Sequence, residues 1–177
     1  MVKKLSRFLA YTLFFIFALM LFVPKTSLYY LLEEKLKEFH IVISKESLDE
    51  TLFSLGVDNL EISVKEIEAG VVKEADIRLL VFYNSLSLKD IQLSSLVESY
   101  LPSKLQALEV TYTPFNPLVL SIEAEGEFGV LHAEYEILQN SISARLKPTN
   151  IMLQKYKKSM KMFKKSKEGA YVYAKSF

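Results

Sequence analysis

The sequence predicts a mainly β protein with one N-terminal transmembrane helix. Its strands are expected to form a curled antiparallel sheet, half-barrel or sandwich-like, with short flanking helices. Apolar and polar residues alternate with a period of two over most of residues 57–146, which is typical of antiparallel strands with one buried face. Short turns separate these runs and no βαβ rhythm is present, which disfavours a doubly wound parallel sheet.

The first element is the apolar run Phe8–Pro24, which carries no charge over seventeen residues. A helix of that length covers roughly 26 Å, close to the ~30 Å hydrocarbon core of a bilayer. A cleaved signal peptide is the alternative, but the run ends in Leu21-Phe22-Val23-Pro24, which is too bulky for a good cleavage site. We therefore expect an uncleaved membrane anchor over residues 8–24. Its expected lipid contacts are Phe8, Leu13, Phe14, Phe15, Ile16, Phe17, Leu19, Leu21 and Phe22.

The charges around this run predict its orientation. Residues 1–7 contain Lys3, Lys4 and Arg7 and no acid, and basic residues stay on the cytoplasmic side of a membrane. We expect residues 1–7 to be a cytoplasmic stub and residues 25–177 to be a single periplasmic β-rich domain. The predicted location is the bacterial inner membrane, crossed once. Because the chain has no cysteine, disulfides and thiolate metal sites are excluded.

An amphipathic helix is predicted over residues 25–39, directly after the anchor. Its apolar residues recur at helical spacing, and Thr26 or Ser27 is expected to cap it. Those apolar residues are Leu28, Leu31, Leu32, Leu36 and Phe39. A short strand is expected at residues 40–44, and a turn of helix ending at Gly56 is expected over residues 45–56.

Seven or eight strands are predicted beyond Gly56, with a helical segment at residues 94–101 before Pro102. Leu80, Phe82, Val119 and Leu138 fall at positions predicted to point away from the core. We expect the first three of these side chains either to line an apolar groove of the curled sheet or to be covered by the terminal helices.

A basic amphipathic helix is predicted over residues 150–167, capped by Asn150 and followed by a last strand at residues 170–177. Its lysines are Lys155, Lys157, Lys158, Lys161, Lys164, Lys165 and Lys167. Three interpretations stay open: a solvated helix packed on the sheet, a helix attracted to anionic headgroups, and a docking site for an acidic partner.

The distribution of charge is uneven along the chain. Before Arg145 there are 12 basic and 20 acidic residues, and from Arg145 onward there are 10 basic and 1 acidic. This skew indicates a basic end rather than a nucleic-acid-binding protein, and export of the domain gives the same expectation of no nucleic-acid partner.

We find no catalytic or metal-binding motif in the sequence. His40 and His132 do not have ligand spacing, and a stripe of acidic residues is interpreted as a solvated face, with a cation site as the alternative. The stripe comprises Glu123, Glu125, Glu127, Glu134 and Glu136. We expect a non-enzymatic protein without a metal or cofactor.

The order of elements resembles a family of secretion proteins. An anchor precedes P-K-x-x-L-Y-Y-L-L-E-E-K-L (Pro24–Leu36) and H-I-V-I-S (His40–Ser44), and the end of the chain has a basic segment followed by E-G-A-Y-V-Y (Glu168–Tyr173). This layout resembles the type II secretion system protein N family, more loosely AsmA-like and bridge-like periplasmic proteins, and more distantly the lipopolysaccharide export protein C family. The resemblance implies an inner-membrane accessory of an envelope secretion or lipid-transport machine and no catalytic residues.

Two functional hypotheses follow. The chain is either a component of an envelope machine that binds a protein partner through sheet edges or the basic helix, or a module that holds acyl chains against an apolar β groove. The expected partners are therefore the membrane, envelope secretion or lipid-transport proteins, and lipid.

Overall fold

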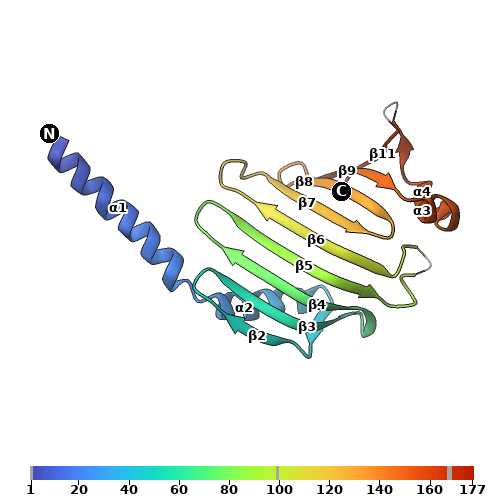
Figure 1. Ribbon diagram of the computed structural model, residues 1–177, viewed down its shortest axis with the longest axis horizontal. Coiled ribbons are helices and arrows are strands. Elements are labelled where there is room, and N and C mark those ends of the chain that lie inside the picture. The colour runs from blue at the N-terminus through green and yellow to red at the C-terminus, as the bar shows by residue number, and fades with distance from the viewer. Residues whose placement is uncertain (1, 99, 167–168) are drawn as a thin grey trace.

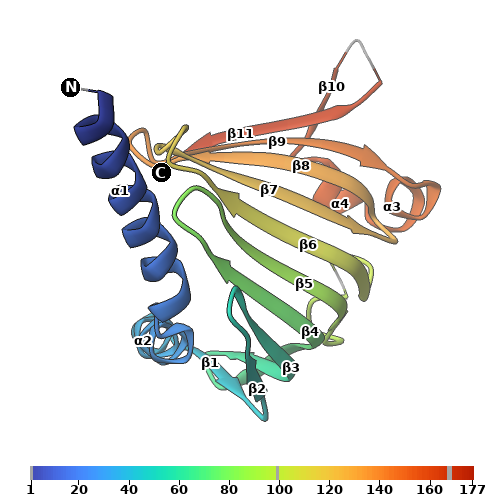
Figure 2. The ribbon, with the colours of Figure 1, turned by 60° about the vertical axis from the view of Figure 1, so that its left-hand side comes forward.

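The computed structural model describes residues 2–98, 100–166 and 169–177. Figures 1 and 2 show one open, curled antiparallel sheet, with a long helix leaving it at one end. The helices are α1 (Val2–Phe22), α2 (Lys25–Glu38), α3 (Asn150–Lys155) and α4 (Lys157–Met160). The strands are β1 (Ile41–Ser44), β2 (Ser47–Glu50), β3 (Ser54–Val64), β4 (Ile67–Leu79), β5 (Asn84–Leu93), β6 (Lys104–Tyr112), β7 (Val119–Gly126), β8 (Gly129–Glu136), β9 (Ser141–Pro148), β10 (Lys164–Lys165) and β11 (Tyr171–Ser176).

The sheet is a meander in the order β1-β3-β4-β5-β6-β7-β8-β9-β11-β10, with β2 also paired to β3. The predicted mainly β class and antiparallel sheet are confirmed. The sandwich-like alternative is wrong, because all eleven strands of the described residues belong to one sheet. The short strand predicted at residues 40–44 is confirmed as β1, whereas β2 and the two-residue β10 were not predicted.

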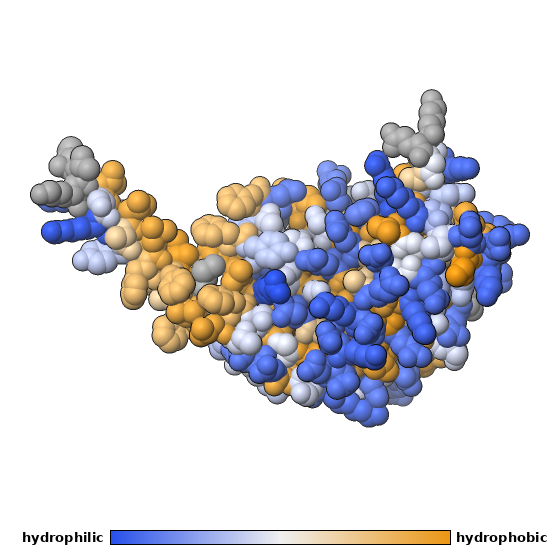
Figure 3. All heavy atoms as spheres, in the orientation of Figure 1, coloured by the Kyte–Doolittle hydropathy of each residue, from blue (hydrophilic) through white to orange (hydrophobic). Residues whose placement is uncertain are grey.

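The alternation in the sequence produces two different faces, because the register places apolar residues opposite one another across eight strands. We call this side the apolar face. One row on it is Leu55, Ile77, Leu86, Val110, Ile122, Ala133, Ala144 and Tyr173, and the next is Val57, Ala75, Leu88, Leu108, Ala124, Leu131, Leu146 and Tyr171. The other side, the polar face, carries most of the charged strand residues and is turned toward the viewer in Figure 3.

Two buried clusters lie on the apolar face. One gathers Tyr29 of α2 with residues of β3, β4 and β5, and the other gathers Met152 and Met160 of α3 and α4 with residues of β7 and β9. Leu105 and Leu108 of β6 pack against both clusters. The core therefore continues across the sheet through β6. Helix α2 covers the first cluster, and α3 and α4 cover the second.

Within the described residues, no helix is long and apolar enough to cross a membrane. The transmembrane anchor predicted over residues 8–24 is therefore not confirmed. The uncharged part of α1 ends with the helix at Phe22, so from Phe8 it covers only about 22 Å, against a hydrocarbon core of about 30 Å.

The helix predicted over residues 25–39 is α2, but its buried face differs from the prediction. Lys25 and Tyr29 are buried, whereas Leu28, Leu31 and Leu32 are exposed. The predicted caps are also wrong, because Glu50 of β2 accepts hydrogen bonds from the backbone N–H groups of Lys25 and Thr26. The start of α2 is thus capped by a carboxylate from a strand, and not by the hydroxyl of Thr26 or Ser27.

The helix turn predicted over residues 45–56 is wrong. This segment contains β2 and the start of β3, which pair with each other, so the leucines at helical spacing belong to two strands. The Thr51 hydroxyl donates to the backbone carbonyl of Ser54 at 3.0 Å and closes the hairpin. Gly56 lies inside β3 and ends no helix.

Two further helix predictions need correction. Among the described residues of 94–101, the chain forms consecutive turns rather than a helix. The single helix predicted over residues 150–167 is α3, α4 and β10, because the backbone at Tyr156 leaves helical geometry (φ −107°, ψ 41°). Its cap is Thr149, whose hydroxyl accepts from the Met152 N–H at 3.3 Å, rather than Asn150. The predicted last strand is confirmed as β11.

Candidate functional site

The middle strands of the apolar face lie between its two helical covers. Helix α2 packs on the apolar face near one edge of the sheet, against β1, β2 and β3. Helix α3 packs on the same face near the other edge, against β9. Leu86 of β5 and Val110 of β6 lie opposite each other between these helices, are only half-buried, and belong to neither buried cluster. The sheet therefore presents apolar side chains between its two helical covers.

The turns at one end of the sheet form a second apolar feature. These are residues 51–53, 80–83, 113–118 and 137–140, and none of them carries a charged side chain. At the opposite end, the turns at 65–66, 94–103 and 127–128 each contain charge. We call the first set the apolar rim. Its exposed large side chains are Leu52, Phe53, Phe82, Tyr83, Phe115, Leu118, Ile137 and Leu138.

Contacts between turns tie the rim together. The rings of Phe82 and Phe115 stack with centroids 6.1 Å apart, which joins the second turn to the third. The Ile137 N–H donates to the Leu118 carbonyl at 2.8 Å, which joins the third turn to the fourth. The Phe177 N–H donates to the Asn140 carbonyl at 2.9 Å and holds the end of β11 against the fourth turn. The second, third and fourth turns of the rim are therefore connected to one another.

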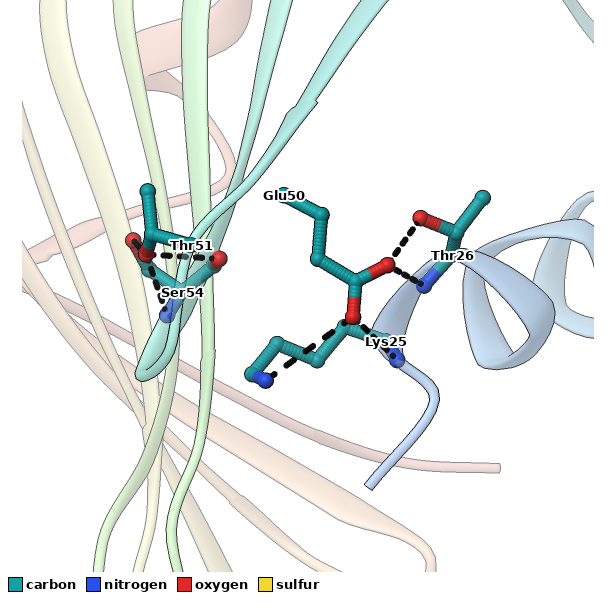
Figure 4. A network of polar contacts seen from close by, with 5 residues as sticks. All are labelled: Lys25, Thr26, Glu50, Thr51 and Ser54. Atoms are coloured by element: carbon teal, nitrogen blue, oxygen red, sulfur yellow. Dashed lines mark hydrogen bonds and ion pairs between the residues drawn. The ribbon is translucent and has the colours of Figure 1, made fainter. Parts of the chain in front are cut away.

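Helix α1 leaves the domain at this same end. Figure 4 shows the joint, where the start of α2 meets Glu50 immediately before the first rim turn. In Figure 1 the β4–β5 and β6–β7 turns point toward the side from which α1 projects, and in Figure 2 α1 runs alongside that end of the sheet. Figure 3 shows α1 as strongly apolar.

The polar face is hollowed over β7, β8, β9 and β11, with a volume of about 670 Å³. Its walls carry Glu123, His132 and Arg145, which are opposite one another in register, together with Lys164 and Met162. His132 Nδ1 lies 3.3 Å from Glu123 Oε1. The lining charges are exposed, so we interpret them as a solvated polar surface rather than as a set of reactive groups.

The register explains the acidic stripe predicted at Glu123, Glu125, Glu127, Glu134 and Glu136. Glu123 faces His132, Glu125 faces Val130, and Glu134 faces Ser121, so like charges do not oppose one another across β7 and β8. No group of three or more metal-binding side chains occurs within the described residues. His40 and His132 both have exposed side chains.

The three residues predicted to line a groove lie in different environments. Leu80 and Phe82 are in the turn after β4 rather than on a strand, so they belong to the apolar rim. Val119 begins β7 opposite Glu136, on the polar face. The alternation was extended three residues too far at the end of β4, and the prediction of groove positions for Leu80 and Phe82 is corrected accordingly.

The predicted lysine cluster is exposed at the described positions. Lys155, Lys157, Lys158, Lys161, Lys164 and Lys165 lie on and after α3 and α4, while Lys167 lies outside the described residues. Figure 1 places α3 and α4 at the end of the molecule away from α1. Their place in the fold thus separates these lysines from the apolar rim.

The predicted anchor residues are mostly exposed along α1: Phe8, Leu13, Phe14, Phe15, Phe17, Leu19 and Phe22 are exposed, and Ile16 and Leu21 are half-buried. Sequence reasoning missed the pairing of Leu86 with Val110 and the exposed rim residue Phe115. The available signal was the lack of charge in alternate turns. Comparison with protein-family models, curated proteins and solved structures finds no match to this chain.

Proposed function

We propose that this protein is a non-enzymatic, membrane-attached module of the bacterial envelope that holds acyl chains against its apolar face. The single observation that carries the proposal is the continuity of two apolar rows across eight strands, with half-buried Leu86 and Val110 at their middle. A lipid chain laid across these strands would remove apolar surface from water at about 25 cal/mol per Å².

Helix α1 supports attachment to a membrane. Its side chains from Phe8 to Phe22 are uncharged and mostly exposed, and a helix that is apolar on all sides is stable only when something apolar surrounds it. We propose that lipid surrounds α1.

The test is photocrosslinking in living cells with the full chain. A photoreactive amino acid replaces Leu86 or Val110 on the apolar face, and the matched controls replace Ser87 or Thr111, which are their neighbours on the polar face of the same strands. We expect lipid adducts, identified by mass spectrometry, at the first pair and not at the second. Equal adduct yields on both faces, or none on the apolar face, would overturn the proposal.

A second candidate is a component of an envelope secretion machine that binds a protein partner by strand addition. The observation that favours it is the open sheet, because β1 at one edge and the two-residue β10 at the other leave backbone groups free of a neighbouring strand within the described residues. A photoreactive residue at Val42 of β1 would then crosslink to one defined envelope protein, whereas one at Ser87 inside the sheet would not.

A further inference from the structure

We propose that the apolar rim rests on the surface of the bilayer in which α1 is held, so that the apolar face opens toward lipid. The inference rests on the proposed function only through the membrane attachment of α1. It assigns a lipid-contacting role to the turns at 51–53, 80–83, 113–118 and 137–140.

The first argument is charge. The four rim turns together contain seventeen residues. Turns normally carry polar and charged residues, because they lie on the surface. The four rim turns contain no charged side chain, whereas Lys65, Glu66 and Glu127 stand in the turns at the opposite end. The asymmetry between the two ends of one sheet indicates that they face different surroundings.

The second argument is residue type and exposure. Phe115 and Leu138 are 83% and 76% exposed, so their rings and methyl groups contribute little to the core. Phe82 adds a further exposed aromatic ring, and Tyr83 is of a residue type that is enriched at the level of lipid headgroups. Tyr83 also keeps a polar end, since its hydroxyl donates to Glu109 Oε1 at 3.0 Å.

The third argument is position, which identifies the occupant as a bilayer. The chain passes from α1 to α2 within two residues, and Glu50 fixes the start of α2 beside the first rim turn. Because α1 and the rim lie at the same end of the sheet, lipid around α1 would be within reach of the rim. Charged strand residues begin directly next to the rim, at Glu50 before residue 51 and at Glu136 before residue 137, and mark its boundary.

The absence of cysteine allows a single fluorescent label at any chosen position of the full chain. Labels are attached through Phe115→Cys and Leu138→Cys on the rim, through Ile67→Cys at the opposite end, and through Phe14→Cys on α1. Ile67 is a matched control, because it is also an exposed apolar residue at the end of a strand. The labelled proteins are reconstituted into phosphatidylcholine vesicles that contain a lipid with a spin label, which quenches nearby fluorescence.

We expect the two rim labels and the α1 label to lose most of their fluorescence, and the Ile67→Cys label to keep it. The double variant Phe115→Asp/Leu138→Asp, carrying its label at Leu52→Cys, should escape quenching, whereas the Ile67→Asp variant with the same label should not. Circular dichroism of each variant checks that the sheet is folded.

Unquenched rim labels beside a quenched α1 label would overturn the inference and leave the membrane attachment intact. Equal quenching at Phe115→Cys and Ile67→Cys would also overturn it, because lipid would then contact both ends. An unquenched label at Phe14→Cys would overturn both the inference and the proposed attachment of α1. Quenched rim labels without lipid adducts at Leu86 would uphold the inference while removing the proposed acyl-chain site.

Discussion

The Nζ atom of Lys25 lies 3.9 Å from Oε1 of Glu50, and the lysine side chain is almost completely buried while the carboxylate remains partly exposed. The same carboxylate accepts from the backbone N–H of Lys25 and of Thr26, each at 3.3 Å, and from the Thr26 hydroxyl. One side chain of β2 therefore caps α2 and neutralises its first residue. This joint fixes the place where α1 enters the domain (Figure 4).

Replacing Glu50 by glutamine should loosen this joint. Glu50→Gln keeps the size of the side chain but removes the negative charge that favours a helix N-terminus and faces buried Lys25. We expect a lower melting temperature and faster amide exchange at the start of α2. Glu34→Gln, on an exposed position of the same helix, is the control and should leave both measurements unchanged. Identical behaviour of the two variants would contradict the role given to Glu50.

Acid should weaken the same joint. The Thr26 hydroxyl, which donates to the Glu50 carboxylate, together with the two backbone N–H groups, holds the pKa of Glu50 below its ordinary value. A lowered folded-state pKa contributes stability above the unfolded-state pKa, near 4.3, and this contribution is lost as the pH falls through the folded value. Wild-type protein should therefore lose more stability than Glu50→Gln between neutral pH and pH about 3. Parallel losses in urea titrations of the two proteins would refute this.

Tyr29 offers a different kind of test, because its hydroxyl is buried and has no hydrogen-bond partner among the described residues. Burial, the largest cause, raises the pKa of Tyr29 above its ordinary value. A buried hydroxyl without a partner costs about 1–3 kcal/mol. We expect Tyr29→Phe to keep the packing of the ring and to raise the free energy of unfolding by up to about 1 kcal/mol. Tyr30→Phe, at an exposed ring, should change it by less than about 0.5 kcal/mol. A clear loss of stability in Tyr29→Phe would mean that the hydroxyl has a partner.

The sequence was sufficient to predict the sheet because its alternation is long and regular. From Leu105 to Leu146 each strand places apolar residues on one side, and the register confirms the pairing that this pattern predicts. The pattern failed at short elements. Leu48, Leu52 and Leu55 fit a helix, but the hairpin bond of Thr51 and the pairing of β2 with β3 decide the structure.

The site was harder to predict because it depends on contacts between distant segments. Leu86 of β5 lies opposite Val110 of the neighbouring strand β6, and the ring of Phe82 stacks on that of Phe115 from another turn. No local pattern encodes either relationship. Likewise, the cap of α2 comes from Glu50, which is 25 residues away in the chain from Lys25. Only the lack of charge in alternate turns was visible in the sequence. It indicates a single apolar surface only once the fold shows that those turns lie at the same end of the sheet.

Gly129 should tolerate no side chain. It has φ +120°, and a Cβ atom built there would lie 2.0 Å from the backbone carbonyl oxygen of Lys147 in β9. Because a backbone atom cannot move aside without breaking the β8–β9 pairing, we expect Gly129→Ala to cost about 2 kcal/mol or more. Gly56→Ala is the control, since its Cβ would meet ordinary contacts of 3.5 Å or longer. Urea unfolding of both variants gives the comparison, and equal midpoints would be incompatible with the strain at Gly129.

The two buried clusters should unfold together because they share side chains of β6. Leu105 packs against Tyr29's cluster on one side and against that of Met152 on the other, so its removal weakens both. We expect Leu105→Ala to lose about 2–4 kcal/mol in a single transition, with the same midpoint by far-ultraviolet circular dichroism and by tyrosine fluorescence. Leu138→Ala, in an exposed rim turn, should lose less than about 0.5 kcal/mol. Two separated transitions in wild-type protein would show instead that the cluster under α2 and the cluster under α3 and α4 unfold independently. The middle strands, where lipid is proposed to bind, would then not couple the two clusters.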